Sequence, residues 1–228
     1  IETAREPDAS VIWMHGLGDD GTGWSEVVPA LQLPPDLRIR FLFPHAPMMP
    51  VTINQGMRMR AWYDVRAANI TERADLDGVR RSQAQVTALI EREAARGIAP
   101  GRIVLAGFSQ GGAIALFAGL RHPQRLAGIV ALSTYLIGRE RLDAEAAPAN
   151  RDVPIFMAHG TQDPVVPYPL GDESRQLLTS AGYAVEWHSY PMPHAVCAEE
   201  IEAIAQFLMR VIGDEEDAPA RSSIILTR

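Results

Sequence analysis

Short apolar segments rich in β-branched residues recur along the chain. They lie at 10–15, 38–44, 102–107, 126–133, 153–160 and 183–190. Continuous apolar runs of this length are typical of strands that are buried on both faces, as in a parallel sheet. The pattern therefore predicts a series of buried strands rather than half-exposed ones.

Helical periodicity separates several of these segments. The clearest example covers residues 72–97 and ends at Gly97, with Pro100 just beyond it. Its apolar stripe among charged positions is formed by Val79, Val86, Leu89 and Ile90. Further helices are expected at 110–121, 169–181 and 196–211. Strands alternating with helices predict an α/β fold, with a mostly parallel central sheet and helices on both of its faces.

No internal repeat and no long linker divides the chain, so we expect one domain over residues 1–212. Residues 213–228 change in character to an acidic stretch followed by "SSIILT". We interpret them as a C-terminal tail that is mobile, a tag remnant or an added edge strand.

Composition narrows the classes of partner. The net charge is −7 and no basic stripe is visible, which argues against nucleic acid. No apolar run approaches the roughly 18 residues that a membrane-spanning helix needs, and the first residues do not resemble a secretory signal. A single cysteine, Cys197, fits a reducing compartment. These features favour a cytoplasmic protein without an integral membrane segment.

The stretch Gly107-Phe108-Ser109-Gln110-Gly111 matches the G-x-S-x-G nucleophile elbow. A nucleophilic serine must project from a sharp strand-to-helix turn, where side chains at the flanking positions would clash. The apolar segment before Ser109 and the alanine-rich helix after it supply that context. The alternative is a glycine-rich turn packed against a helix without chemistry.

A serine nucleophile needs a base and an orienting acid, which in this architecture follow it in the order acid, then histidine. Asp163 and His194 each come just after a predicted strand, where loops at the carboxyl edge of a parallel sheet carry function. The alternatives are an ordinary turn aspartate and a loop histidine. The other candidates fall at a helix end, within a strand, before a strand or within a helix: His122, His188, Asp152 and Asp172.

Acyl transfer also requires two backbone donors for the developing oxyanion. The amide of Gln110, directly after the nucleophile, is one candidate. The glycine-rich loop at 13–24 supplies Leu17 as the other, unless that loop is only a tight turn. His159 and Asp163 have no third ligand at a suitable spacing, so we expect no metal.

Several motifs together resemble one family. "HGLGDDGTGW", "FPHAP", "PVTINQGMRMRAWYDV", "GFSQGGAIAL", "HGTQDPVVP" and "PHAV" are similar to the bacterial carboxylesterase and acyl-protein thioesterase (lysophospholipase) family of the α/β-hydrolase fold. The resemblance covers residues 10–212 and is closer to the bacterial carboxylesterases. It implies little or no cap domain and hydrolysis of esters and thioesters without a cofactor. It also implies a triad of Ser109, Asp163 and His194, with Leu17 and Gln110 as oxyanion donors.

By the same resemblance, residues 50–65 form the rim that binds the acyl chain, and Trp62 lines the site. We assign Met48, Met57 and Val165 as further substrate contacts. Methionines at 48, 49, 57 and 59 suggest a pliable apolar surface, or else core packing beneath a long loop. Arg58 and Arg60 are either phosphate ligands or solvated side chains.

The sequence thus predicts a serine carboxylic-ester hydrolase that acts on short- to medium-chain acyl esters through an acyl-enzyme. Its substrates would be small-molecule or lipid esters, or an acylated protein. The alternatives are an acyl-protein thioesterase, a lysophospholipase and a non-catalytic binding module of the same fold. The resemblance is also compatible with a homodimer, because members of this family often form dimers.

Overall fold

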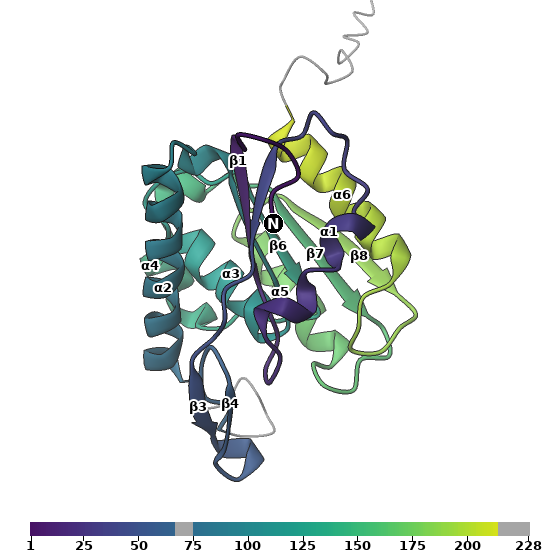
Figure 1. The fold of residues 1–228 in the computed structure, drawn as a ribbon. Helices are drawn as coiled ribbons and strands as arrows, with labels where there is room; N and C mark the ends of the chain where they lie inside the picture. Colours follow the sequence, from purple (N-terminus) through teal and green to yellow (C-terminus); the bar gives the residue numbers. More distant parts are fainter. Residues whose placement is uncertain (67–74, 214–228) are drawn as a thin grey trace, which may run out of the picture.

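The computed structural model describes residues 1–66 and 75–213, and within them six strands form one sheet (Figure 1). The strand order is β2-β1-β5-β6-β7-β8, and every neighbouring pair is parallel. The strands are β1 (Ala9–Met14), β2 (Ile39–Leu42), β5 (Ile103–Phe108), β6 (Gly128–Leu132), β7 (Ile155–Gly160) and β8 (Val185–Tyr190). The predicted parallel sheet is confirmed, with strand boundaries shifted by one or two residues.

Helices cover both faces of this sheet (Figure 1). They are α1 (Val27–Ala30), α2 (Leu76–Ala95), α3 (Gln110–Arg121), α4 (Leu142–Glu145), α5 (Tyr168–Ser180) and α6 (Ala198–Ile212). Short 3₁₀ turns occur at Gly21–Trp24, Thr52–Asn54, Pro100–Arg102, Arg139–Arg141 and Pro148–Asn150. Residues 72–74 of the helix predicted over 72–97, and residues 214–228 of the predicted tail, lie outside the described residues.

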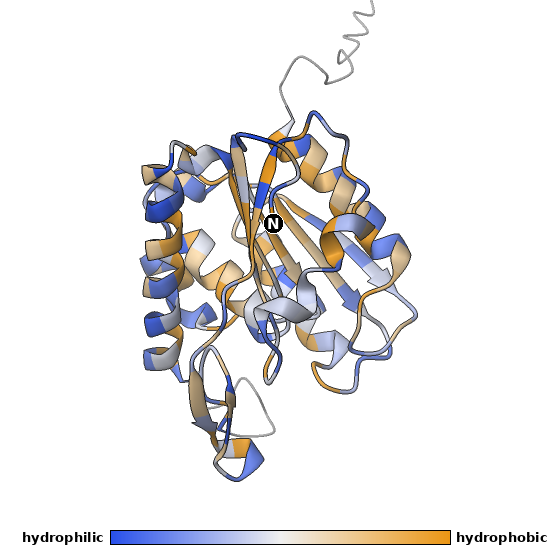
Figure 2. Ribbon diagram, in the orientation of Figure 1, coloured by the Kyte–Doolittle hydropathy of each residue, from blue (hydrophilic) through white to orange (hydrophobic). Residues whose placement is uncertain are grey.

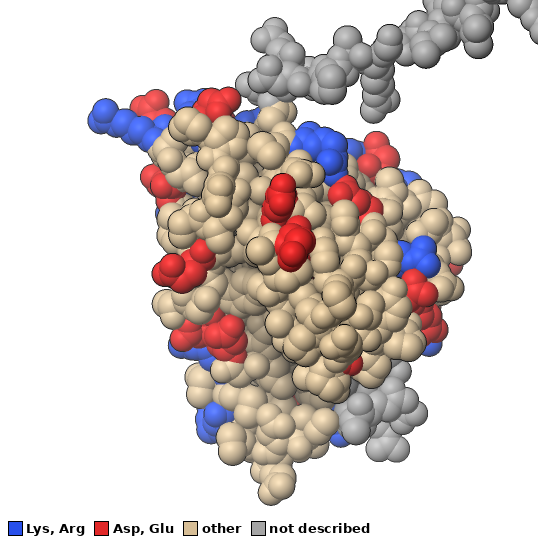
Figure 3. Space-filling model, turned by 90° about the vertical axis from the view of Figure 1, so that its right-hand side faces the viewer, with Lys and Arg blue, Asp and Glu red and all other residues tan. Residues whose placement is uncertain are grey.

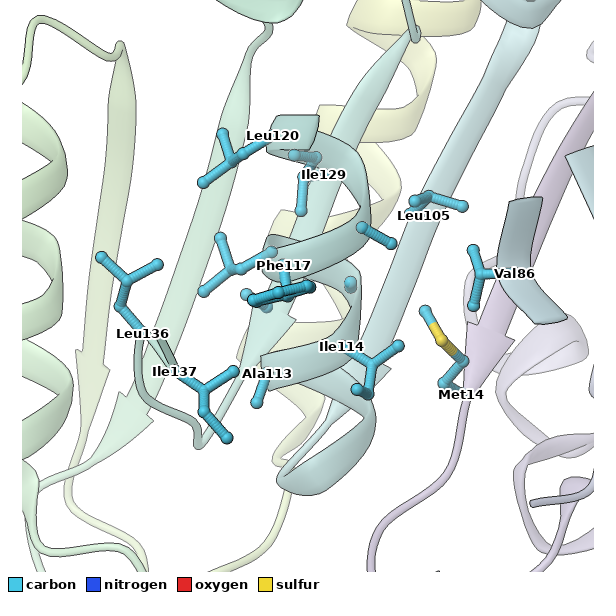
Figure 4. Packing of buried hydrophobic residues seen from close by; sticks show 14 of the residues in the cluster. Met14, Val86, Leu105, Ala113, Ile114, Phe117, Leu120, Ile129, Leu136 and Ile137 are labelled. Atoms are coloured by element: carbon cyan, nitrogen blue, oxygen red, sulfur yellow. The ribbon is translucent and has the colours of Figure 1, made fainter. Parts of the chain in front are cut away.

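Two apolar cores lie on the two faces of the sheet because successive strand side chains point in opposite directions. Helices α2, α3 and α5 cover one core, and α1 and α6 cover the other. Helix α3 is buried all round, and Figure 4 shows its side chains in one cluster with Leu105 and Ile129 of the strands and Val86 of α2. Figure 2 shows the opposite pattern on α2, whose hydrophilic positions face outward. Burial on both faces explains why the strands read as continuous apolar runs.

A two-stranded antiparallel hairpin extends away from the sheet (Figure 1). It consists of β3 (Met48–Val51) and β4 (Met57–Arg60) and turns through Gln55 and Gly56, both with positive φ. The sequence analysis treated this region as a rim loop, and the structure shows that it is a hairpin. Charged side chains are sparse over the lower part of the face shown in Figure 3.

Parallel strands place their carboxyl ends at one edge of the sheet. The loops after β1, β5, β7 and β8 therefore open on the same side, and these loops carry the predicted triad and oxyanion-donor residues. At the opposite edge, the guanidinium of Arg102, just before β5, donates to the carbonyl of Ile212 at 2.6 Å. This contact fixes the end of α6 near the start of the central strands.

Candidate active site

Ser109 occupies the turn between β5 and α3 in a strained conformation. Its φ of 55° and ψ of −120° are unusual for a residue with a side chain. The turn is held by its backbone, because the Ser109 N–H donates to Leu132 O at 2.9 Å and Thr134 Oγ1 donates to Ser109 O at 2.7 Å. The strain is thus supported by the neighbouring strand, which is what a nucleophile elbow requires.

The glycines around Ser109 are required by space. A Cβ added to Gly107 would lie 2.2 Å from the carbonyl carbon of Gly111, and one added to Gly111 would lie 2.1 Å from Met14 O. Atoms at these separations overlap, and both neighbours are backbone. The prediction that flanking side chains would clash is confirmed.

Asp163 and His194 are brought together from separate loops. Their side chains form a hydrogen bond of 2.6 Å between His194 Nδ1 and Asp163 Oδ2. The other carboxylate oxygen of Asp163 accepts from the N–H groups of Val165 and Val166 at 2.8 and 2.9 Å. The carboxylate is fully buried, whereas the imidazole keeps 15% exposure. Such an arrangement holds the histidine in one tautomer, with Nε2 free to accept a proton.

The His194 imidazole lies beside the elbow. Its ring centroid is 4.6 Å from that of Phe108, the residue before Ser109. Within the described part of the chain, no hydrogen bond joins the Ser109 hydroxyl to this imidazole. Catalytic hydrogen bonds of this kind are often long before substrate binds.

The loop after β1 packs directly on the elbow. A Cβ built on Gly16 would lie 3.5 Å from Ser109 Cβ and 3.4 Å from the Phe108 ring. The next residue, Leu17, is partly exposed, and Gly18 turns the chain with a φ of 78°. Leu17 and the buried Gln110 therefore lie on the two segments that meet at Ser109.

The four residues predicted to contact the acyl chain differ in exposure. Met48, Met57 and Val165 are 50%, 65% and 58% exposed, so they are open to a ligand. Trp62 is only 2% exposed, and its indole N–H donates to His15 O at 2.8 Å. Its main contacts are therefore with the loop that precedes Leu17.

Two arginines on the hairpin donate to backbone carbonyls of the hairpin or of the residues just before it. Arg58 donates to Met48 O at 3.1 Å, and Arg60 donates to Ala46 O at 2.9 Å. Each guanidinium thus has a backbone partner, which neither interpretation given above, phosphate ligand or solvated side chain, had included.

His159 and Glu200 are buried, and the sequence predicted no role for either. His159 Nε2 lies 2.8 Å from Val166 O and 3.5 Å from Asp163 Oδ2, and burial lowers the pKa of this histidine. Glu200, six residues after His194, is wholly buried in the first turn of α6, and burial raises its pKa to about 8. Residue type alone gave no signal for either, because both depend on tertiary burial.

The remaining candidates lie where the sequence analysis placed them. His122 caps the end of α3, His188 pairs with Glu186 within β8, and Asp172 lies inside α5. Cys197 is the N-cap of α6, and burial raises the pKa of its thiol. Among the described residues, no group of three or more His, Cys, Asp or Glu side chains is arranged to hold a metal ion. None of the helices described there is long and apolar enough to cross a bilayer.

A parallel sheet covered on both faces, with a strained serine at the turn after a central strand, defines the α/β-hydrolase fold. Solved structures agree with this class. SOBER1 of Arabidopsis thaliana superimposes with a TM-score of 0.85 at 29% identity, covering 90% of this chain and 99% of that one. The acyl-protein thioesterase 2 of Zea mays gives a TM-score of 0.78 at 31% identity, covering 91% and 95%.

Sequence comparison identifies the family within this class. The phospholipase/carboxylesterase family model matches residues 1–212. Acyl-protein thioesterase 1 of Neurospora crassa is 46% identical over 210 residues, which cover 88% of this chain and 85% of that protein. The chain therefore belongs to the phospholipase/carboxylesterase family, and it is a hydrolase of the carboxylesterase and thioesterase type. These relatives are eukaryotic, so they do not support the closer likeness to bacterial carboxylesterases.

Proposed function

We propose that the protein hydrolyses acyl esters through a triad of Ser109, His194 and Asp163. The observation that carries the proposal is the 2.6 Å hydrogen bond between Asp163 and His194, with the imidazole packed beside the residue that precedes Ser109. A buried carboxylate, an imidazole and a strained serine on three adjacent loops suit nucleophilic acyl transfer better than any other chemistry.

In the proposed cycle, His194 Nε2 removes the proton of the Ser109 hydroxyl as its oxygen attacks the carbonyl carbon. Asp163 orients the imidazole and stabilises the imidazolium. The oxyanion accepts hydrogen bonds from the amides of Leu17 and Gln110. The alcohol or thiol leaves with the proton from His194, and a water molecule then releases the acyl group from Ser109 by the same steps.

For the substrate, we propose that the exposed side chains of Met48, Met57 and Val165 contact a short- to medium-chain acyl group. Methionine side chains adapt to flexible apolar ligands. Trp62 would line the acyl site from beneath this surface, because its side chain is almost wholly buried. We further propose a cytoplasmic location, where the single, partly buried thiol stays reduced.

An acyl-protein thioesterase is the second candidate. The observation in its favour is the 46% identity to a protein of that name in Neurospora crassa. Its test is to compare kcat/KM for an acyl thioester and for the oxyester of the same acyl chain. A clear preference for the thioester would put this candidate first.

The proposed triad is tested by hydrolysis of p-nitrophenyl esters from acetate to palmitate, with Ser109→Ala in parallel. We expect the variant to lose roughly 10⁶ in kcat, because a triad acts as a unit. A maximum at short chains would support the carboxylesterase, and one at long chains would favour a lysophospholipase or thioesterase. Turnover that survives in Ser109→Ala would exclude the triad.

A further inference from the structure

Trp62 and Tyr63 lie between the two segments that carry the proposed oxyanion donors. On one side, the side-chain amide of Gln110 binds both of their backbones. Its Oε1 accepts from the Trp62 N–H at 3.0 Å, and its Nε2 donates to Tyr63 O at 2.9 Å. Two hydrogen bonds fix the plane of this side chain. Because Gln110 is the first residue of α3, they also fix where the helix begins.

On the other side, the Trp62 side chain holds the loop after β1. The Trp62 indole N–H donates to His15 O at 2.8 Å, and the two rings lie with centroids 5.3 Å apart. His15 is itself fully buried, and its Nε2 accepts from the Ala46 N–H at 3.0 Å. Burial lowers the pKa of His15, which keeps that nitrogen available as an acceptor. The carbonyl that Trp62 binds lies two residues before Leu17.

The residues between these two attachments are themselves fixed. Trp62 and Tyr63 are each 2% exposed. Ser82 of α2 donates to Trp62 O, and the Tyr63 hydroxyl is hydrogen-bonded to the Tyr135 hydroxyl at 3.0 Å. A segment that is anchored to α2 and buried can transmit position from one loop to the other.

We propose that Trp62 and the Gln110 side chain are positioning residues that set the distance between the Leu17 and Gln110 amides. The inference rests on the proposed function, since it assigns an oxyanion role to those amides. Donors must lie within about 2.7–3.1 Å of the oxyanion to act, so a small displacement of either loop weakens both bonds. Trp62 thereby acts on the reaction through a backbone that it braces.

The test uses Trp62→Phe, which removes the hydrogen bond to His15 O, and Gln110→Met, which removes both hydrogen bonds to the Trp62 and Tyr63 backbones. Each new side chain is apolar and similar in shape to the one that it replaces. We expect kcat for the preferred ester to fall about 10- to 100-fold in each, less than the 10²–10³ that follows loss of a whole donor. KM should change by less than about threefold. An alkyl trifluoromethyl ketone forms a hemiketal oxyanion when the Ser109 hydroxyl oxygen attacks its carbonyl carbon. Its affinity should fall by the same factor as kcat. The double variant should lower kcat by less than the product of the two single fold-changes, because both substitutions act on one segment.

Asn150→Ala is the matched control. It removes three hydrogen bonds between a buried side chain and backbone groups far from Trp62 and Gln110, so it should lower stability and leave kcat and inhibitor affinity unchanged. The proposal is overturned if Trp62→Phe and Gln110→Met lower only the melting temperature, or if Asn150→Ala impairs kcat equally. If one of the two variants fails to fold, kcat and inhibitor affinity of the other variant test the proposal. Ser109-independent turnover would instead overturn the proposed function itself.

Discussion

Glu200 is a buried carboxyl group whose ionisation should cost folding stability. Neither of its oxygens has a hydrogen-bond partner among the described residues. Burial raises its pKa from 4.5 to about 8, and the nearby Cys197 backbone N–H offsets this only in part. The groups it influences are Tyr190 at the end of β8 and Cys197 at the start of α6. Near neutral pH we expect the folded protein to hold Glu200 protonated.

The direction of the pH dependence follows from the difference between the ordinary pKa of a glutamate and the raised pKa of Glu200 in the folded state. The folded state binds the proton more tightly than the unfolded state, so the contribution of Glu200 is fully present below about pH 4.5. It is lost as the pH rises through about 8. At about 1.4 kcal/mol per pH unit, this interval corresponds to a loss of roughly 5 kcal/mol at most. This is comparable to the whole stability of a marginal domain, about 5–15 kcal/mol.

Glu200→Gln removes the titration and keeps the shape of the side chain. The assay is urea unfolding of both proteins from pH 4.5 to 9, with the difference in unfolding free energy plotted against pH, so that other groups cancel. We expect the unfolding free energy of the variant to rise relative to that of the wild type as the pH increases. This difference should level off above about pH 8. Glu199→Gln is the matched control, because that neighbour is exposed. A difference that does not change with pH would refute the reasoning.

Three further predictions concern packing, a buried amide and the acyl surface. Gly111→Ala places a Cβ 2.1 Å from Met14 O, so we expect it to lower the free energy of unfolding by at least about 1–3 kcal/mol and to abolish esterase activity. Gly101→Ala is the control, because its added Cβ would meet no atom closer than 3.9 Å. It should be tolerated in the same denaturation and activity assays. Asn150→Ala breaks three buried hydrogen bonds to backbone groups and should cost about 3 kcal/mol or more by urea unfolding, with KM unchanged. Met57→Ser should reduce kcat/KM for longer p-nitrophenyl esters more than for the acetate, and an unchanged chain-length profile would contradict its assignment to the acyl surface.

Much of the fold could be predicted because the strands are buried on both faces. A segment such as 153–160 has no polar face, and its apolar run therefore marked β7 clearly. The hairpin of β3 and β4 could not be found in this way. The residues of β4 alternate Met with Arg, and the arginines bond to carbonyls within the hairpin or beside it, which only the folded chain reveals.

The site shows the same division. Chain order and strand ends were enough to pair Asp163 with His194, and their hydrogen bond agrees with that pairing. Trp62 was expected to line the acyl site, but its burial depends on contacts with His15 and α2 that are distant in sequence. Glu200 follows another glutamate at the start of a helix, a pattern that predicts solvated acids near a helix N-terminus. Only tertiary packing distinguishes its buried side chain from the exposed one of Glu199.

The contact between Arg102 and Ile212 has a practical consequence for handling the enzyme. It places the end of α6 at the amino-terminal edge of the sheet, while Ser109, Asp163 and His194 follow the carboxyl ends of their strands. A tether attached beyond residue 213 therefore starts from the side away from these residues. Immobilisation on a bead or electrode through that end should turn the catalytic face toward the solution.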